Sequence, residues 1–243
     1  MIPNRLQERP LPEDFARKLL LHSTNAKSGS LDKGELREVT SPFLSEPLGF
    51  VGVGSADDVI KAFELSRRAQ QQWQERSIAS RARVFKRFHD LVKAHRDLLA
   101  DIVQLETGKD RTAAYDEVLD VMNNARYYAN NAEKFLATKD QAGAFPVITS
   151  TTLQRVPKGI VGQISPWNYP LALGVSDAIA ALIAGNGVVA KPDWQTPFSN
   201  LISLHLLLNA GLPHDLFQIV TGSGEVVGQA IAERCDYLMF TGS

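Results

Sequence analysis

The sequence of 243 residues has a single cysteine, no long apolar run and almost no net charge. One thiol excludes a disulfide framework within the chain and fits a reducing compartment. No apolar stretch approaches the roughly 20 residues that a membrane-spanning helix needs, and residues 1–10 lack the apolar core of a signal peptide. A formal net charge of −1 gives no electrostatic argument for binding to nucleic acid or an anionic membrane. These absences predict a soluble, cytoplasmic protein without nucleic-acid or membrane partners.

The beginning of the chain is predicted to be an N-terminal arm. Residues 1–54 are rich in Ser, Gly, Pro and Lys, which favour turns and irregular backbone. Within them, the pattern indicates a short helix near Pro12–Leu21 and extended pieces near Leu36–Thr40 and Phe50–Val53.

Residues 55–140 are predicted to be helical. Ser55 and Asp58 resemble a capping box at the start of a helix over Ala56–Gln74. Two further stretches with helical spacing follow, the second stopped by Gly108, and a fourth helix is expected over Ala113–Leu136. Three acidic side chains of that last helix are expected to form a solvated face: Asp116, Glu117 and Asp120.

The remaining sequence changes to strands. Residues 141–157 are β-branched and polar, which predicts a strand or hairpin, and residues 158–243 alternate strands with helices. The short apolar runs typical of strands buried on both faces are Ile160–Ser165, Val188–Lys191, Phe217–Thr221 and Tyr237–Phe240. The helices expected between them are Leu171–Ala184, Pro197–Ala210 and Glu225–Glu233. This alternation predicts an α/β fold with a Rossmann-like parallel sheet and flanking helices, preceded by the helical region and the hairpin.

The middle one of these helices has clear end signals. Thr196 is expected as its N-cap, Pro197 as its first residue and Gly211 as its C-cap.

Ligands of parallel sheets bind at the carboxyl ends of the strands, so chemistry is expected in the loops that leave those ends. These loops are Ser165–Tyr169, Lys191–Thr196, Thr221–Gly228 and Thr241–Ser243.

Three features of these loops each allow two interpretations. The glycine-rich loop at Thr221–Gly228 indicates either a nucleotide site or a tight strand-to-helix turn, since its spacing is one residue longer than the usual dinucleotide motif. Lys191 could hold a ribose or phosphate or be solvated, and its position at the ligand edge favours the former. Asn168 lies between two prolines, where its amide could face a developing oxyanion or hydrogen-bond locally within the turn.

No metal site is predicted, because the five histidines show no metal-ligand spacing with one another or with Cys235. Cys235 is the only candidate thiol nucleophile. However, it lies between Glu233 and Asp236, which disfavour a thiolate, and at the amino end of a predicted strand. A structural role is therefore favoured for Cys235.

Taken together, short motifs along the chain resemble the aldehyde dehydrogenase superfamily. They occur in the family's order from Ser55 onward, and they are Leu105–Lys109, Arg126–Ala129, Pro157–Gly159, Pro166–Pro170, Ala184–Asn186, Lys191–Pro192, Gln195–Pro197, Ala210–Pro213 and Phe240–Ser243. Within the superfamily, Lys191–Asp193 and Cys235–Phe240 look most like bacterial succinate-semialdehyde dehydrogenases.

The resemblance implies roles for the residues at the ligand edge. Asn168 is expected to be the side-chain donor of the oxyanion hole, with Trp167 and Tyr169 flanking the cofactor and the substrate tunnel. Lys191 would bind the adenosine ribose, and Gly224 with the following helix would hold the adenine side. Gly242 and Ser243 would meet the pyrophosphate. The full set of expected cofactor-binding residues is Ser165, Pro166, Trp167, Asn168, Lys191, Pro192, Asp193, Trp194, Gly224, Glu225, Gly242 and Ser243.

The chain departs from the family pattern in two respects. The third position after Lys191 is usually glutamate in members that prefer NAD and a small polar residue in members that accept the 2′-phosphate of NADP, but here it is Trp194. An indole neither binds the 2′-hydroxyl as a carboxylate does nor leaves space for a phosphate. The choice between NAD and NADP is therefore open, and replacing Trp194 with serine is predicted to tighten NADP binding. The family's general base, in a Glu-Leu-Gly-Gly-Lys motif, and its nucleophilic cysteine both belong further along than Ser243.

These features favour the cofactor-binding portion of an NAD(P)-dependent aldehyde dehydrogenase, truncated before its general base and nucleophile. In this interpretation residues 55–140 and 158–243 form the cofactor-binding domain, and residues 141–157 belong to the oligomerisation region. The intact enzyme, a dimer or tetramer, would oxidise a small aldehyde such as succinate semialdehyde to a carboxylic acid. This chain alone is expected to be inactive. The alternative is a non-enzymatic fragment that binds nucleotide or a partner protein.

Overall fold

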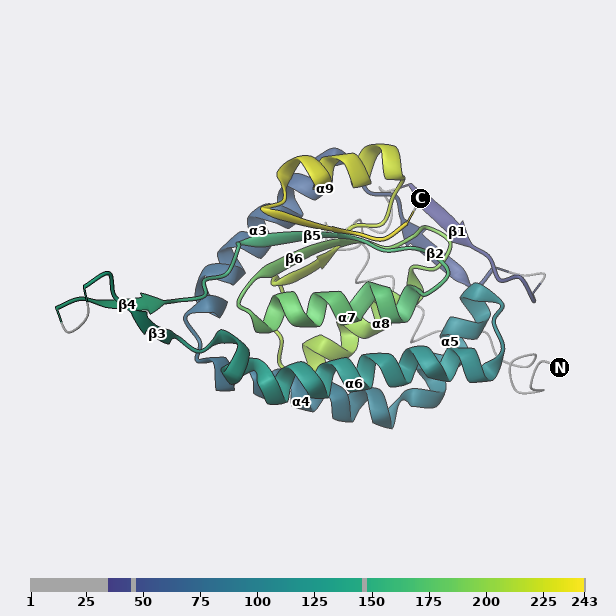
Figure 1. Ribbon diagram of the computed structural model, residues 1–243. Coiled ribbons are helices and arrows are strands. Elements are labelled where there is room, and N and C mark those ends of the chain that lie inside the picture. Colours follow the sequence, from purple (N-terminus) through teal and green to yellow (C-terminus); the bar gives the residue numbers. More distant parts are fainter. Residues whose placement is uncertain (1–34, 45–46, 146–147, 243) are drawn as a thin grey trace.

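A parallel β-sheet with helices on both faces forms the centre of the molecule (Figure 1). The computed structural model describes residues 35–44, 47–145 and 148–242, so the helix predicted near Pro12–Leu21 lies outside the described residues. The sheet has the order β7-β6-β5-β8, with all neighbours parallel. Its strands are β5 (Ile160–Ile164), β6 (Gly187–Lys191), β7 (Phe217–Ile219) and β8 (Tyr237–Phe240). The predicted α/β fold with a parallel sheet is confirmed.

The helices form layers on the two faces of this sheet. They are α3 (Ala56–Gln74), α4 (Ile78–Ala94), α5 (Arg96–Thr107), α6 (Arg111–Leu136), α7 (Pro170–Ile183), α8 (Phe198–Asn209) and α9 (Gln229–Arg234). Helices α3 and α9 cover one face, and α7 and α8 cover the other (Figure 1). Helices α4, α5 and α6 pack outside α7 and α8. Among the described helices, none is long and apolar enough to cross a membrane.

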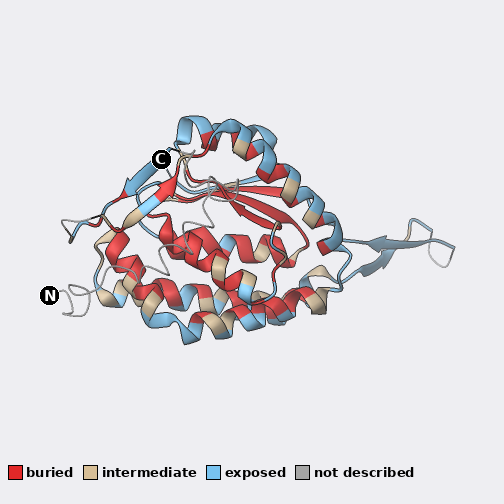
Figure 2. Cartoon of the chain, turned by 180° about the vertical axis from the view of Figure 1, so that it is seen from behind, coloured by how far each residue is buried: buried red, intermediate tan, exposed pale blue. Residues whose placement is uncertain are grey.

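Two apolar clusters hold these layers together, with β5, β6 and β7 buried between them (Figure 2). The smaller cluster joins α3 and α9 to the sheet through residues such as Phe63, Val189 and Ile231. The larger one fills the space between the sheet, α7, α8 and the outer helices. Trp73 is fully buried, and its indole N–H donates to the Leu182 carbonyl at 2.7 Å, which ties α3 to α7.

Most helix ends agree with the predicted signals. The Ser55 hydroxyl and the Asp58 carboxylate form the expected capping box of α3. Gly108 ends α5 in the left-handed conformation, with φ of 79°. Helix α6 begins two residues before the predicted start, because the Asp110 side chain accepts the N–H of Ala113.

Three predictions about the second half were wrong in detail. Strand β8 was expected to be buried on both faces, yet Tyr237 and Phe240 are exposed, because within the described residues β8 is an edge strand that pairs with β5 alone. The helix expected over Glu225–Glu233 begins as a π-helical turn, Gly224–Gly228, before α9. The C-cap of α8 is Ala210, and Gly211 follows it with φ of 97°.

Two antiparallel hairpins complete the described fold. Strands β1 (Leu36–Val39) and β2 (Gly49–Gly52) correspond to the two extended pieces predicted in the arm, and the structure shows that they pair with each other. Strands β3 (Lys139–Ala142) and β4 (Ser150–Leu153) form the second hairpin, which starts two residues before the predicted range. All residues of β3 and β4 are exposed, and this hairpin projects away from the body (Figures 1 and 2).

Candidate functional site

The loops at the carboxyl ends of the four parallel strands enclose a cavity of about 480 Å³. The predicted site residues that line it are Ser165, Pro166, Trp167, Asn168, Lys191, Asp193, Trp194, Gly224 and Gly242. Those that do not line it are Tyr169, Pro192 and Glu225. Ser243 lies outside the described residues. The structure thus brings together residues from four separate loops, at the edge where parallel sheets bind ligands.

Lys191 is the buried cation of this cavity. It ends β6 and is only 5% exposed. Its Nζ donates to the neighbouring Pro192 carbonyl at 3.2 Å, and within the described residues this is its one hydrogen bond. Burial lowers the pKa of Lys191, and the nearby Asp193 carboxylate partly offsets that effect. An ammonium group has three donors, so the cavity leaves donors of Lys191 for a ligand with hydroxyl or phosphate oxygens.

The turn after β5 presents Asn168 at the cavity. The Ser165 N–H donates to the Lys191 carbonyl at 3.2 Å, which joins the start of this turn to the end of β6. Trp167 and Asn168 are exposed. Within the described residues the Asn168 amide group makes no hydrogen bond, so the structure does not support the alternative in which this side chain bonds locally in the turn.

Glu117, which is 1% exposed, contacts the segment directly after this turn, at the start of α7. Its carboxylate accepts the N–H groups of Leu171 and Ala172, at 2.9 and 3.0 Å, and thereby caps the start of α7. Lys109 pairs with the same carboxylate and donates to the Asn168 carbonyl at 2.8 Å. The prediction that Glu117 belongs to a solvated face was therefore wrong, although Asp116 and Asp120 are exposed. Helical spacing could not show that α7 begins beside this residue.

A second buried carboxylate, Glu106, caps α8. It accepts the N–H groups of Phe198 and Ser199 and the Ser199 hydroxyl. The N-cap residue is Pro197, so the predicted capping by Thr196 was wrong: the acceptor comes from α5. Burial raises the pKa of Glu106 to about 8, against the effect of these hydrogen bonds, and the charge of Glu117 contributes in the same direction as burial.

The glycine-rich loop after β7 leaves open space beside it. The Ser223 hydroxyl accepts the N–H of Val226 at 3.2 Å and caps the π-helical turn. A Cβ added at Gly224 would meet no atom within 4 Å, whereas one at Gly222 would come 2.4 Å from Val227. The loop therefore combines tight packing at Gly222 with room for a ligand at Gly224.

The aldehyde dehydrogenase family matches residues 30–243. The chain belongs to the aldehyde dehydrogenase family. The resemblance inferred from the sequence motifs is thereby confirmed.

Several individual aldehyde dehydrogenases are similar to this chain. It is 51% identical, over 96% of its length, to a Mycolicibacterium smegmatis protein named "putative succinate-semialdehyde dehydrogenase", with NADP(+) in its name, of which it covers 44%. It is 32% identical to the betaine aldehyde dehydrogenase of Bacillus subtilis, covering 88% of this chain and 44% of that protein. An NAD+ complex of an aldehyde dehydrogenase from Bacillus cereus has a TM-score of 0.80 at 32% identity, over 86% of this chain and 43% of that one. The chain thus spans under half the length of these relatives.

The single thiol of this aldehyde dehydrogenase chain lies away from the cavity. The Asp236 N–H donates to the Ile160 carbonyl at the start of β5, which places Cys235 at the amino ends of the strands, as predicted. A Cβ added at Gly162 would come 2.9 Å from the Cys235 Cβ, so the cysteine packs closely against the sheet. Because the cavity is at the carboxyl ends, Cys235 does not reach it.

Proposed function

We propose that this chain provides the NAD(P)-binding site and the oxyanion donor of an enzyme that oxidises an aldehyde to a carboxylic acid. The observation that carries the proposal is a single cavity that joins the buried ammonium of Lys191 to the turn bearing Asn168. The chain's membership of the aldehyde dehydrogenase family supports the same reaction class.

The cofactor half of the proposal rests on Lys191 and the two glycine-containing loops. Lys191 would donate to the adenosine ribose, since Nζ has donors that the described residues leave unpaired. Gly224 would leave room for the adenine side, and Gly242 together with Ser243 would meet the pyrophosphate. The bound nicotinamide would supply the hydride acceptor of the reaction.

The reaction half rests on Asn168. Its side-chain N–H would donate to the aldehyde oxygen as negative charge develops there. Lys109 and Glu117 hold the turn at the Asn168 carbonyl and at the start of α7, so the amide would need little reorganisation during the reaction. Trp167 and Tyr169 would flank the cofactor and the substrate tunnel. Cys235 is not the nucleophile in this proposal, because it lies at the other edge of the sheet.

The proposed substrate is a small aldehyde, with succinate semialdehyde suggested by the names of similar proteins. The proposed assembly is a homo-oligomer, and the projecting hairpin of β3 and β4 supports this, since its exposed strands offer free edges for pairing.

The nucleotide site can be tested on the 243-residue chain by calorimetric titration with NAD+ and with NADP+. We expect saturable binding, and a rise in Kd of tenfold or more in Lys191→Met, because a charged hydrogen bond is lost. Lys86→Met is the matched control, since Lys86 is an exposed lysine of α4 outside the cavity. A folded wild-type chain that binds neither nucleotide would refute the site.

The reaction can be tested in the natural protein that carries this sequence. We expect formation of reduced nicotinamide with succinate semialdehyde, and a loss of about 10²- to 10³-fold in kcat for Asn168→Ala. Turnover by the 243-residue chain itself would overturn the proposal, because the proposal assigns it no nucleophile. An intact mass of the natural protein near that of this chain, with nucleotide binding and no turnover, would instead support the non-enzymatic fragment.

A further inference from the structure

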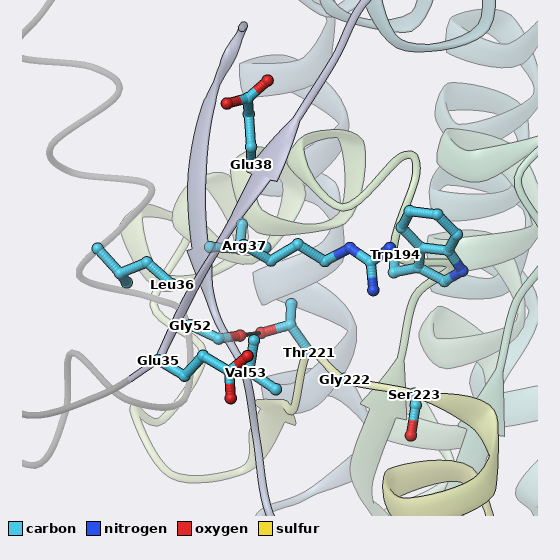
Figure 3. Close-up of a pocket in the computed structure, with 11 residues that line it drawn as sticks. Glu35, Leu36, Arg37, Glu38, Gly52, Val53, Trp194, Thr221, Gly222 and Ser223 are labelled. Carbon is cyan, nitrogen blue, oxygen red and sulfur yellow. Dashed lines mark hydrogen bonds between the residues drawn. The ribbon is translucent and has the colours of Figure 1, made fainter.

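A second cavity adjoins the proposed cofactor site and meets it at Trp194. It has a volume of about 330 Å³ and lies between the hairpin of β1 and β2 and the loop after β7 (Figure 3). Trp194 lines both cavities, and the neighbouring residues Ser223 and Gly224 line one each. A group attached to the adenosine ribose in the first cavity therefore needs only to pass Trp194 to enter the second.

The second cavity contains a guanidinium group that is stacked on Trp194. The Arg37 Cζ atom lies 3.4 Å from the centroid of the Trp194 ring, and Figure 3 shows the Arg37 side chain extending from β1 toward the indole. Within the described residues Arg37 forms no ion pair. Two carboxylates, Glu35 and Glu38, also line this cavity, but Figure 3 shows both directed away from the stacked pair.

Arg37 lies in strand β1, and hydrogen bonds to the segment after β7 hold the hairpin of β1 and β2 in place. Arg37 is opposite Val51 in the ladder of β1 and β2. That hairpin is fastened to the end of β7, because the Gly54 N–H donates to the Thr221 carbonyl at 2.7 Å and the Thr221 hydroxyl donates to the Gly52 carbonyl. The backbone that carries Arg37 is thus held against the edge of the sheet where the cofactor cavity opens.

Stacking suits a guanidinium group for binding phosphate. The contact with the indole uses the face of the planar group and leaves the N–H donors at its edge, where they can bind two phosphate oxygens at once. The indole also limits the rotamers of a long, flexible side chain, so less entropy is lost when the ligand binds.

We infer that Arg37, held by Trp194, binds the 2′-phosphate of the adenosine ribose and makes the chain prefer NADP over NAD. This inference rests on the proposed placement of the ribose beside Lys191. It reverses the expectation drawn from the sequence, in which Trp194 only obstructs a phosphate and its replacement by serine tightens NADP binding.

The experiment compares two small probes by calorimetry on the 243-residue chain: adenosine 2′,5′-bisphosphate and adenosine 5′-monophosphate, which differ only in the 2′-phosphate. In wild type we expect the bisphosphate to bind about ten- to a hundredfold more tightly. Arg37→Met should reduce this ratio to near one by weakening only the bisphosphate. Arg37→Lys should leave an intermediate ratio, since it keeps the charge and loses the planar fork. Trp194→Ser should lower the ratio, and Trp194→Phe should largely preserve it.

Arg83→Met is the matched control, because Arg83 is an exposed arginine of α4 that lines neither cavity, and it should leave the ratio unchanged. Circular dichroism establishes that each variant is folded. A wild-type ratio near one, or a ratio that Arg37→Met does not change, would overturn the role of Arg37. A higher ratio in Trp194→Ser would overturn the role of the stack. If a folded wild-type chain binds neither probe, the proposed cofactor site itself fails.

Discussion

The buried carboxyl group of Glu106 should make the stability of this protein decrease as the pH rises from about 5 to 8. Glu106 is 5% exposed and caps α8, and burial raises its pKa from 4.5 to about 8. Between these two values the native state binds a proton that the unfolded state has released. The unfolding free energy contributed by this group is therefore fully present below the unfolded pKa and is lost as the pH rises through the native one.

The size of the effect follows from the two pKa values. Each pKa unit corresponds to about 1.4 kcal/mol, and the native form is nearly fully protonated at pH 5 and half protonated near pH 8. The unfolding free energy should therefore fall by about 3.5 kcal/mol between pH 5 and pH 8 on account of Glu106 alone. That is a large fraction of the stability of a typical domain.

Urea denaturation at a series of pH values measures this contribution when wild type is compared with Glu106→Gln. Glutamine cannot ionise, so the difference between the two curves removes the titration of all other groups, including Asp177, whose pKa burial also raises. The variant should be less stable at pH 5 by about 1–3 kcal/mol, because its amide N–H₂ faces the donors of Ser199. By pH 8 the difference in unfolding free energy should have moved by about 3.5 kcal/mol in favour of the variant, so that the deficit disappears or reverses. If the stability deficit of the variant stays constant or grows as the pH rises, burial does not outweigh the hydrogen bonds in setting the pKa of Glu106.

Three further predictions concern residues around the sheet. Trp73→Phe should lower the unfolding free energy by about 1–2 kcal/mol, because the hydrogen bond from the indole N–H to the Leu182 carbonyl is lost, while the Gly185 N–H still donates to that carbonyl; equal urea midpoints would contradict this. Glu117→Gln should cost about 3 kcal/mol by leaving Lys109 without its charged partner, and the double variant with Lys109→Met should cost less than the sum of the two single changes; strict additivity in chemical denaturation would argue against the pair. Cys235→Ala should keep the Kd for NADP+ within about twofold of wild type, since the thiol lies at the other edge of the sheet; clearly weaker binding in calorimetry would show otherwise.

Local sequence patterns were sufficient for most of the secondary structure. Hydrophobic spacing and the Ser55–Asp58 box predicted α3 over the observed residues, and Gly108 marked the end of α5. The alternation after Gly159 predicted a parallel sheet, and with it the edge at which Lys191 and Asn168 now line one cavity. These features depend on neighbours within a few residues, or on a rule that applies to all parallel sheets, so no distant contact was needed to infer them.

The interactions that hold and tune this site were decided only by the tertiary structure. The cap of α8 comes from Glu106, which is 92 residues away from Phe198, and that distance hides it from any local capping rule. The local sequence around Glu117 is typical of an exposed helix residue, but in the folded chain the start of α7 packs against Glu117 and buries it. Trp194 is an obstruction when its own loop is considered alone, and it becomes a platform once β1 places Arg37 on its face. In each case the free energy of a charged or aromatic side chain is set by burial and by partners from distant segments, and the amino-acid sequence specifies these only through the completed fold.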